Sequence, residues 1–91
     1  MLYELPLLSG SGSVGRAEYE EAGVRVRFRC RLHGSERLCK LYLTRGGSRA
    51  LLGTPAPAQG GLYLERTLSR SELERAGVWP PERVEVDFGG E

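Results

Sequence analysis

The sequence predicts a mainly β fold with one short helix, arranged as a compact antiparallel meander that forms a small sandwich or a partly open barrel of six to seven strands. Three observations favour this fold class. Apolar residues alternate with arginines along residues 24–32. Two-residue turns that contain glycine join apolar stretches of strand length. Residues 70–76 have helix-capping residues at both ends. We interpret residues 1–88 as one small β-rich domain and residues 89–91 as a flexible C-terminal tail.

The overall composition is that of a globular protein. The chain has 91 residues, of which 40% are hydrophobic and 27% are charged. Its formal net charge of +1 does not demand a polyanionic partner. The N-terminus lacks the basic segment of a signal peptide, and Glu4 and Pro6 interrupt its short apolar run. We therefore expect neither a signal peptide nor a membrane span, a cytoplasmic location, and two free cysteine thiols.

The N-terminal part predicts one strand followed by a loop. Leu2–Leu8 is expected to be a strand that Pro6 limits to a sheet edge or a strand end. Ser9–Gly15 is expected to be a flexible loop. This loop matches the pattern G-x-G-x-x-G, but a dinucleotide site also needs a following helix and an acidic residue about 20 positions further on. The sequence offers neither, so we interpret the segment as a plain glycine-serine loop.

The stretch 24–32 is the clearest strand of the chain. A period of two places five apolar residues on one side and four arginines on the other. The apolar side consists of Val24, Val26, Phe28, Cys30 and Leu32, and the basic side of Arg25, Arg27, Arg29 and Arg31.

The preceding residues, 16–22, combine helical propensity with the alternation of a strand. We predict a strand that an Ala22-Gly23 turn joins to strand 24–32. Glutamates would then neutralise half of the arginines across the hairpin. The expected pairs are Glu20 with Arg25 and Glu18 with Arg27.

Two further turns extend the meander. His33–Glu36 has Gly-Ser at its centre, as in a type II′ hairpin, and pairs strand 24–32 with strand 37–44. The apolar residues of both strands would then face the same core. The expected inward pairs are Cys30 with Cys39, Phe28 with Leu41 and Val26 with Leu43, and the outward pairs are Arg27 with Tyr42 and Arg29 with Lys40. The Gly-Gly turn Arg45–Ser48 adds strand 49–54, with the pairs Leu43 with Ala50, Tyr42 with Leu51 and Leu41 with Leu52.

The C-terminal third contains the helix and two more strands. Residues 55–61 form a link long enough to reach a second sheet, and residues 62–68 alternate again as a strand. Ser69 and Glu72 form a capping box at the start of helix 70–76, and Gly77 fits its end. Trp79 is expected to cover a core edge before a last strand that contains Val84, Val86 and Phe88.

The residues that could carry chemistry are few. Cys30, His33 and Cys39, with Glu36, have the residue types of a zinc site. However, the predicted register places the cysteines on the core face and His33 on the other face, about 10 Å away. We interpret the cysteines as buried free thiols and expect no metal or other cofactor. With one histidine, one aspartate and no nucleophile elbow, we expect no enzyme; Cys39 and His33 would be its only candidates.

The predicted binding surface is the outer face of strands 24–32 and 37–44. Arginines beside aromatic and aliphatic groups are typical of protein interfaces. The sequence therefore predicts a non-enzymatic binding domain whose partner is another protein or its own copy, with no membrane and no small-molecule cofactor. The alternative is a module that binds nucleic acid through the same arginine and tyrosine side chains. The candidate residues are Arg25, Arg27, Arg29, Arg31, Lys40, Tyr42 and Leu51.

Overall fold

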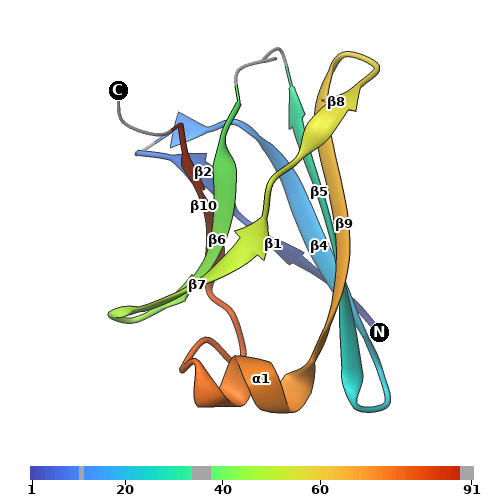
Figure 1. Cartoon of the computed structure of the whole chain (residues 1–91), viewed down its shortest axis with the longest axis vertical. Helices are drawn as coiled ribbons and strands as arrows, with labels where there is room; N and C mark the ends of the chain where they lie inside the picture. The colour runs from blue at the N-terminus through green and yellow to red at the C-terminus, as the bar shows by residue number, and fades with distance from the viewer. Residues whose placement is uncertain (11, 34–37, 89–91) are drawn as a thin grey trace.

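The computed structural model describes residues 1–10, 12–33 and 38–88. They form two five-stranded sheets and one short helix before the last strand. Figure 1 shows the two sheets facing each other. The predicted fold class is therefore confirmed, although the described residues form ten strands rather than six or seven. The centre of the predicted turn after His33 and the predicted tail, residues 89–91, lie outside the described residues.

The first sheet, sheet A, is antiparallel throughout and has the strand order β1-β4-β5-β9-β8. The bounds of its strands are β1 Leu2–Leu5, β4 Gly15–Ala22, β5 Arg25–His33, β9 Gly61–Ser69 and β8 Ala56–Ala58. The arginine-rich strand β5 therefore lies at the centre of sheet A.

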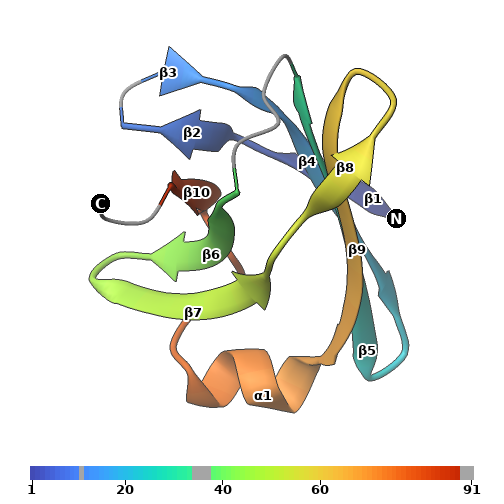
Figure 2. The same ribbon diagram turned by 45° about the horizontal axis from the view of Figure 1, so that its top comes forward.

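The second sheet, sheet B, has the order β3-β2-β10-β6-β7, and Figure 2 shows it opposite sheet A. Its strands are β3 Gly12–Ser13, β2 Leu7–Ser9, β10 Arg83–Asp87, β6 Lys40–Arg45 and β7 Ser48–Gly53. Strands β2 and β10 are parallel, and the other neighbours are antiparallel. Strand β3 lies in the segment predicted as a loop.

The predicted first strand divides at Pro6 into β1 of sheet A and β2 of sheet B. Proline has no backbone N–H and cannot continue a ladder as a donor, so the chain leaves one sheet here. The Pro6 carbonyl accepts a hydrogen bond of 2.9 Å from the Val84 N–H of sheet B. Pro6 thus marks the transfer of the chain between the two sheets.

The hairpin of β4 and β5 confirms that residues 16–22 are a strand, but its turn is Gly23-Val24 instead of Ala22-Gly23. Gly23 has φ +65°, which the first central position of a type II′ turn requires. Val24 is therefore 76% exposed at the hairpin tip instead of buried in the core. The pairs also shift by two residues: Glu18 lies opposite Arg29, Glu20 opposite Arg27 and Ala22 opposite Arg25.

The predicted pairing of strand 24–32 with strand 37–44 is wrong. Strand β5 pairs with β4 and β9, whereas β6 belongs to sheet B. Strand β9 matches β5 over its whole length, from Arg25 opposite Ser69 to His33 opposite Gly61. The predicted inward pairs of Cys30 with Cys39, Phe28 with Leu41 and Val26 with Leu43 are accordingly absent from the described ladders. The predicted outward pairs of Arg27 with Tyr42 and Arg29 with Lys40 are absent as well. The apolar sides of β5 and β6 do face one core, from opposite sheets.

The hairpin of β6 and β7 is the one predicted, with Leu43 opposite Ala50 and Tyr42 opposite Leu51. An irregularity between Leu41 and Tyr42 shifts the end of the ladder, so Leu41 lies opposite Gly53 instead of Leu52. Residues 55–61, predicted as a link, do carry the chain from sheet B to sheet A, but they contain strand β8 and the first residue of β9.

The core lies between the two sheets. Apolar side chains alternate inward along β5, β6 and β10 and meet there, which removes them from water. The largest side chains that the fold buries include Phe28, Leu7, Leu32, Leu41, Leu43, Leu52 and Leu62. Trp79 packs against this core in a T-shaped contact with Tyr19, at 5.7 Å between ring centroids.

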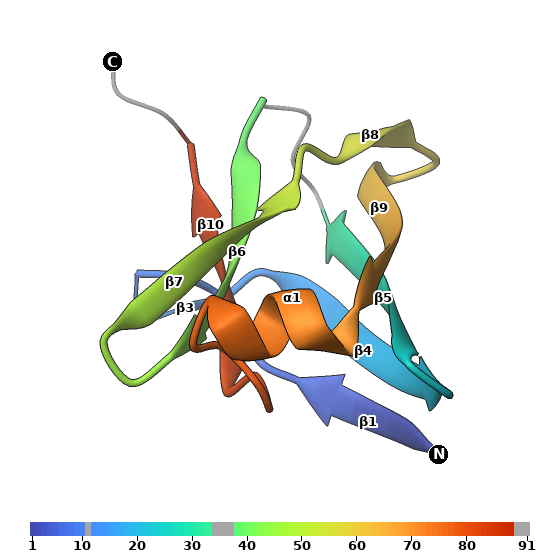
Figure 3. The same cartoon turned by 60° about the horizontal axis from the view of Figure 1, so that its bottom comes forward.

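The helix α1, Arg70–Arg75, lies at one end of the two sheets (Figure 3) and buries Leu73. Its capping box is formed as predicted, because the Ser69 hydroxyl accepts the Glu72 N–H and the Glu72 carboxylate accepts the Ser69 N–H. At the other end Gly77 has φ +77°, and the Val78 N–H bonds the Leu73 carbonyl at 3.1 Å. The part of the chain that the structure describes contains no helix with the length and apolar character needed to cross a membrane.

Candidate binding surfaces

The structure divides the predicted binding residues between two surfaces. Arg25, Arg27, Arg29 and Arg31 project from β5 on the outer face of sheet A, and Lys40, Tyr42 and Leu51 lie on β6 and β7 of sheet B. The single face predicted for strands 24–32 and 37–44 does not exist, since the two strands belong to different sheets.

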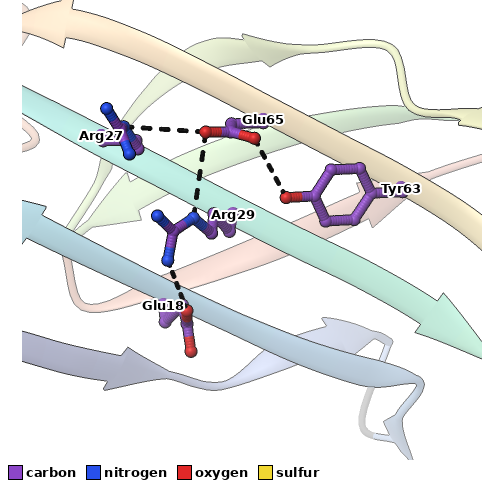
Figure 4. A network of polar contacts seen from close by, with 5 residues as sticks. All are labelled: Glu18, Arg27, Arg29, Tyr63 and Glu65. Carbon is purple, nitrogen blue, oxygen red and sulfur yellow. Dashed lines mark hydrogen bonds and ion pairs between the residues drawn. The ribbon is translucent and has the colours of Figure 1, made fainter.

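The middle of sheet A carries a network of ion pairs, drawn in Figure 4. The Arg29 guanidinium reaches Glu18 on one neighbouring strand at 3.4 Å and Glu65 on the other at 3.9 Å. Arg27 approaches the same Glu65 carboxylate at 3.6 Å. The Tyr63 hydroxyl also donates to Glu65, at 3.2 Å, and burial and this acceptor raise the pKa of Tyr63. Glutamates thus compensate Arg27 and Arg29, as the sequence predicted in general but with different partners.

Arg31 has different neighbours. It lies opposite Arg16 on β4 and opposite Tyr63 on β9. Its guanidinium lies over the Tyr63 ring, 5.1 Å from the ring centroid. Among the described residues, no acidic group forms an ion pair with Arg16 or Arg31. Arg25 lies further along β5, between Ala22 and Ser69.

A cavity of about 420 Å³ opens at this end of sheet A. We call it the arginine cavity. It is lined by Arg16, Glu18, Arg29, Cys30, Arg31, His33 and Tyr63. Since Glu18 and Arg29 bind each other, the charge left at the cavity comes from Arg16 and Arg31.

The outer face of sheet B has an apolar row instead. Leu8, Glu85, Tyr42 and Leu51 are successive partners across β2, β10, β6 and β7. Leu51 is 53% exposed, and the Arg49 guanidinium lies 3.8 Å from the centroid of the Tyr42 ring. Beside this row, a second cavity of about 350 Å³ is lined by Leu38, Cys39, Lys40, Tyr42, Thr54, Asp87 and Phe88.

Sequence reasoning missed Arg16, Tyr63 and Leu8. Arg16 and Tyr63 join Arg31 only because β4 and β9 flank β5 in a particular register. The signal for Arg16 was present, since the hairpin of β4 and β5 was predicted, but the turn lies one residue further along than predicted, and the resulting two-residue shift of the pairs hid the Arg16–Arg31 pair. Tyr63 lies beside Arg31, and Leu8 beside Glu85, because strands far apart in the sequence pair with each other. No local sequence pattern predicts such pairings.

Both cysteines are buried and free of disulfide bonds. Burial raises the pKa of the Cys30 thiol to about 12 and also raises the pKa of Cys39. In residues 1–10, 12–33 and 38–88, no three His, Cys, Asp or Glu side chains lie together so that they could hold a metal ion. Comparison with known protein families, with characterised proteins and with solved structures finds no match.

Proposed function

We propose that this protein is a non-enzymatic binding domain that associates with a second copy of itself through the outer face of sheet B. The observation that carries the proposal is the row of Leu8, Tyr42 and Leu51, which crosses four strands and is interrupted only by Glu85. Leu38, at the adjacent cavity, is 73% exposed. Aromatic and apolar groups of this kind, with arginine at the rim, are enriched at the centres of protein interfaces.

The composition of the face fits a two-fold contact between identical copies. In such a contact each patch meets its own copy, so the patch must be self-complementary. The apolar row satisfies this condition. On the same face Arg49 pairs with Asp87 at 3.4 Å, and Glu85, the charged member of the row, pairs with Arg83 at 2.8 Å. These four charges are thus compensated within one copy and do not repel an identical partner.

The chemistry of the side chains supports a role without catalysis. A thiol whose pKa is raised by burial has little of the reactive thiolate at neutral pH, which applies to Cys30 and Cys39. His33 is exposed at the end of β5. Among the contacts of the described residues, no partner therefore activates Cys39 as a nucleophile or His33 as a base.

Sedimentation velocity over a range of protein concentrations tests the proposal. We expect the wild type to form a dimer and Leu51→Ser or Tyr42→Ser to sediment as a monomer. Leu2→Ser is the matched control, because Leu2 is also 53% exposed but lies on sheet A. A wild type that stays monomeric at high concentration contradicts the proposal, as does a Leu2→Ser variant that dissociates as readily as Leu51→Ser.

A further inference from the structure

We propose that the arginine cavity binds the phosphate group of a ligand of nucleotide size, with the phosphate between Arg16 and Arg31 and a ring of the ligand against Tyr63. The site lies on sheet A and does not depend on the self-association proposed for sheet B. Four features of the described residues carry the inference: the paired arginines, the lack of acidic partners, the aromatic wall and the size of the cavity.

The first feature is a like-charged pair. Arg16 and Arg31 are direct cross-strand neighbours, and such neighbours have Cβ atoms about 4.5–5.5 Å apart. Two positive side chains in these positions repel each other. A dianionic group between them would turn that repulsion into two attractions, and the guanidinium fork matches the oxygen geometry of a phosphate.

The second feature is the distribution of acidic groups around the pair. Glu18 on β4 binds Arg29, and Glu65 on β9 binds Arg27 and Arg29. Glu4 on β1 lies opposite Glu18 and forms no ion pair with Arg16 or Arg31 among the described residues. Glu18 and Glu65 both lie opposite Arg29, in the row of side chains next to the one that contains Arg31. The network of Figure 4 therefore compensates Arg27 and Arg29, and the positive charges of Arg16 and Arg31 remain at the cavity.

The third feature is the wall of the cavity. Tyr63 is half-buried, and its hydroxyl is held by Glu65, which fixes one end of the ring. Aromatic side chains beside basic groups stack with nucleic-acid bases, and this contact does not depend strongly on the identity of the base. His33, which also lines the cavity, adds a ring nitrogen that can donate a hydrogen bond.

The size of the cavity is the fourth feature. Its volume of about 420 Å³ lies within the usual range for small-molecule sites. An isolated phosphate would leave most of this space to water, whereas a nucleotide places its phosphate and its ring in one cavity. Both a free nucleotide and a single-stranded polynucleotide supply this chemistry.

Calorimetric titration of the whole chain at low salt tests the proposal, with AMP, adenosine and inorganic phosphate as probes. We expect AMP to bind more tightly than phosphate and adenosine to bind least. Arg16→Gln and Arg31→Gln should each weaken AMP binding about tenfold or more, because each removes a charge-assisted contact. Tyr63→Leu should weaken AMP binding and leave phosphate binding unchanged.

Arg25→Gln is the matched control, since Arg25 is an exposed arginine of the same strand that does not line the cavity. It should bind AMP like the wild type. The proposal is overturned if AMP does not bind at millimolar concentration, if adenosine or phosphate binds as well as AMP, or if Arg25→Gln loses as much affinity as Arg31→Gln. Circular dichroism establishes that each variant is folded.

A short oligoadenylate identifies the source of the phosphate. If it binds more tightly than AMP and responds to the same two arginine variants, the phosphate belongs to a polynucleotide, and its affinity should fall steeply with salt. If AMP binds as tightly as the oligonucleotide, the ligand is a free nucleotide. Both results support the site, whereas oligonucleotide binding that ignores both variants overturns it.

Discussion

Arg16 and Arg31 are opposite partners on neighbouring antiparallel strands, two like charges side by side in a sheet where glutamates pair with Arg27 and Arg29. Close like-charged pairs lower stability by amounts similar to those by which opposite charges raise it. Repulsion between these two arginines therefore lowers the free energy of unfolding of the ligand-free protein, and a bound anion would remove the repulsion. Both the stability of the protein and its affinity for an anion should depend on this pair.

The first prediction concerns that cost. Without a ligand and at low salt, Arg16→Gln should raise the free energy of unfolding by about 0.2–1 kcal/mol, because it removes the repulsion of Arg31. High salt screens exposed charges and should abolish the gain. Urea denaturation at two salt concentrations measures both. Arg25→Gln, which removes an arginine that lies opposite Ala22, should show no such gain; a salt-independent or destabilising effect of Arg16→Gln would contradict the interpretation.

The second prediction concerns the close approach of three strands at the end of β5. A Cβ added at Gly15 would overlap the Arg31 carbonyl oxygen, and one added at Gly61 would overlap the Leu32 carbonyl oxygen. Because backbone atoms cannot move aside cheaply, each Gly→Ala variant should lose about 1–3 kcal/mol of stability. Chemical denaturation compares them with Gly47→Ala, where an added Cβ meets open space. Equal stability of all three variants would show that the strands separate easily here.

The third prediction concerns alkaline pH. Burial raises the pKa of the Cys30 thiol from its ordinary value of 9.0 to about 12, so the folded protein keeps a proton that the unfolded chain releases. The resulting contribution to stability is present below pH 9.0 and is lost as the pH rises toward about 12.

Denaturation curves collected across this interval should therefore show a steeper loss of stability for the wild type than for Cys30→Ala. Tyr19, whose pKa burial also raises, titrates in both proteins, so the difference between them isolates the thiol. Identical pH dependence of the two proteins would mean that Cys30 is open to water in the folded state.

The fourth prediction concerns the start of α1. Ser69→Ala removes the hydroxyl that accepts the Glu72 N–H at 3.2 Å and should cost about 1 kcal/mol of stability. Ser71→Ala removes an exposed hydroxyl that lies 3.4 Å from the Ser69 hydroxyl but accepts no backbone N–H among the described contacts, so it should change stability by less than about 0.5 kcal/mol. The thermal midpoints of the two variants measure the difference. A Ser71 variant as unstable as the Ser69 variant would argue against the capping box.

The sequence by itself determined those features that depend on neighbours along the chain. The alternation of Val26, Phe28 and Cys30 with arginines defined a strand with one buried and one charged side, because side chains of an extended chain alternate. The β6–β7 hairpin followed from its Gly-Gly turn, and the ends of α1 followed from Ser69 and Gly77. In each of these, the residues that decide the structure lie within a few positions of one another.

Only the tertiary structure decided which strands meet. An apolar strand side fits any facing apolar side, so periodicity could not show that β9 rather than β6 lies beside β5. For this reason the predicted binding face is divided between the two sheets. Tyr42 lies in sheet B, and the tyrosine beside the arginines of sheet A is Tyr63. The Arg16–Arg31 pair depended further on a turn shifted by one residue, because moving a hairpin turn by one residue moves every cross-strand pair by two.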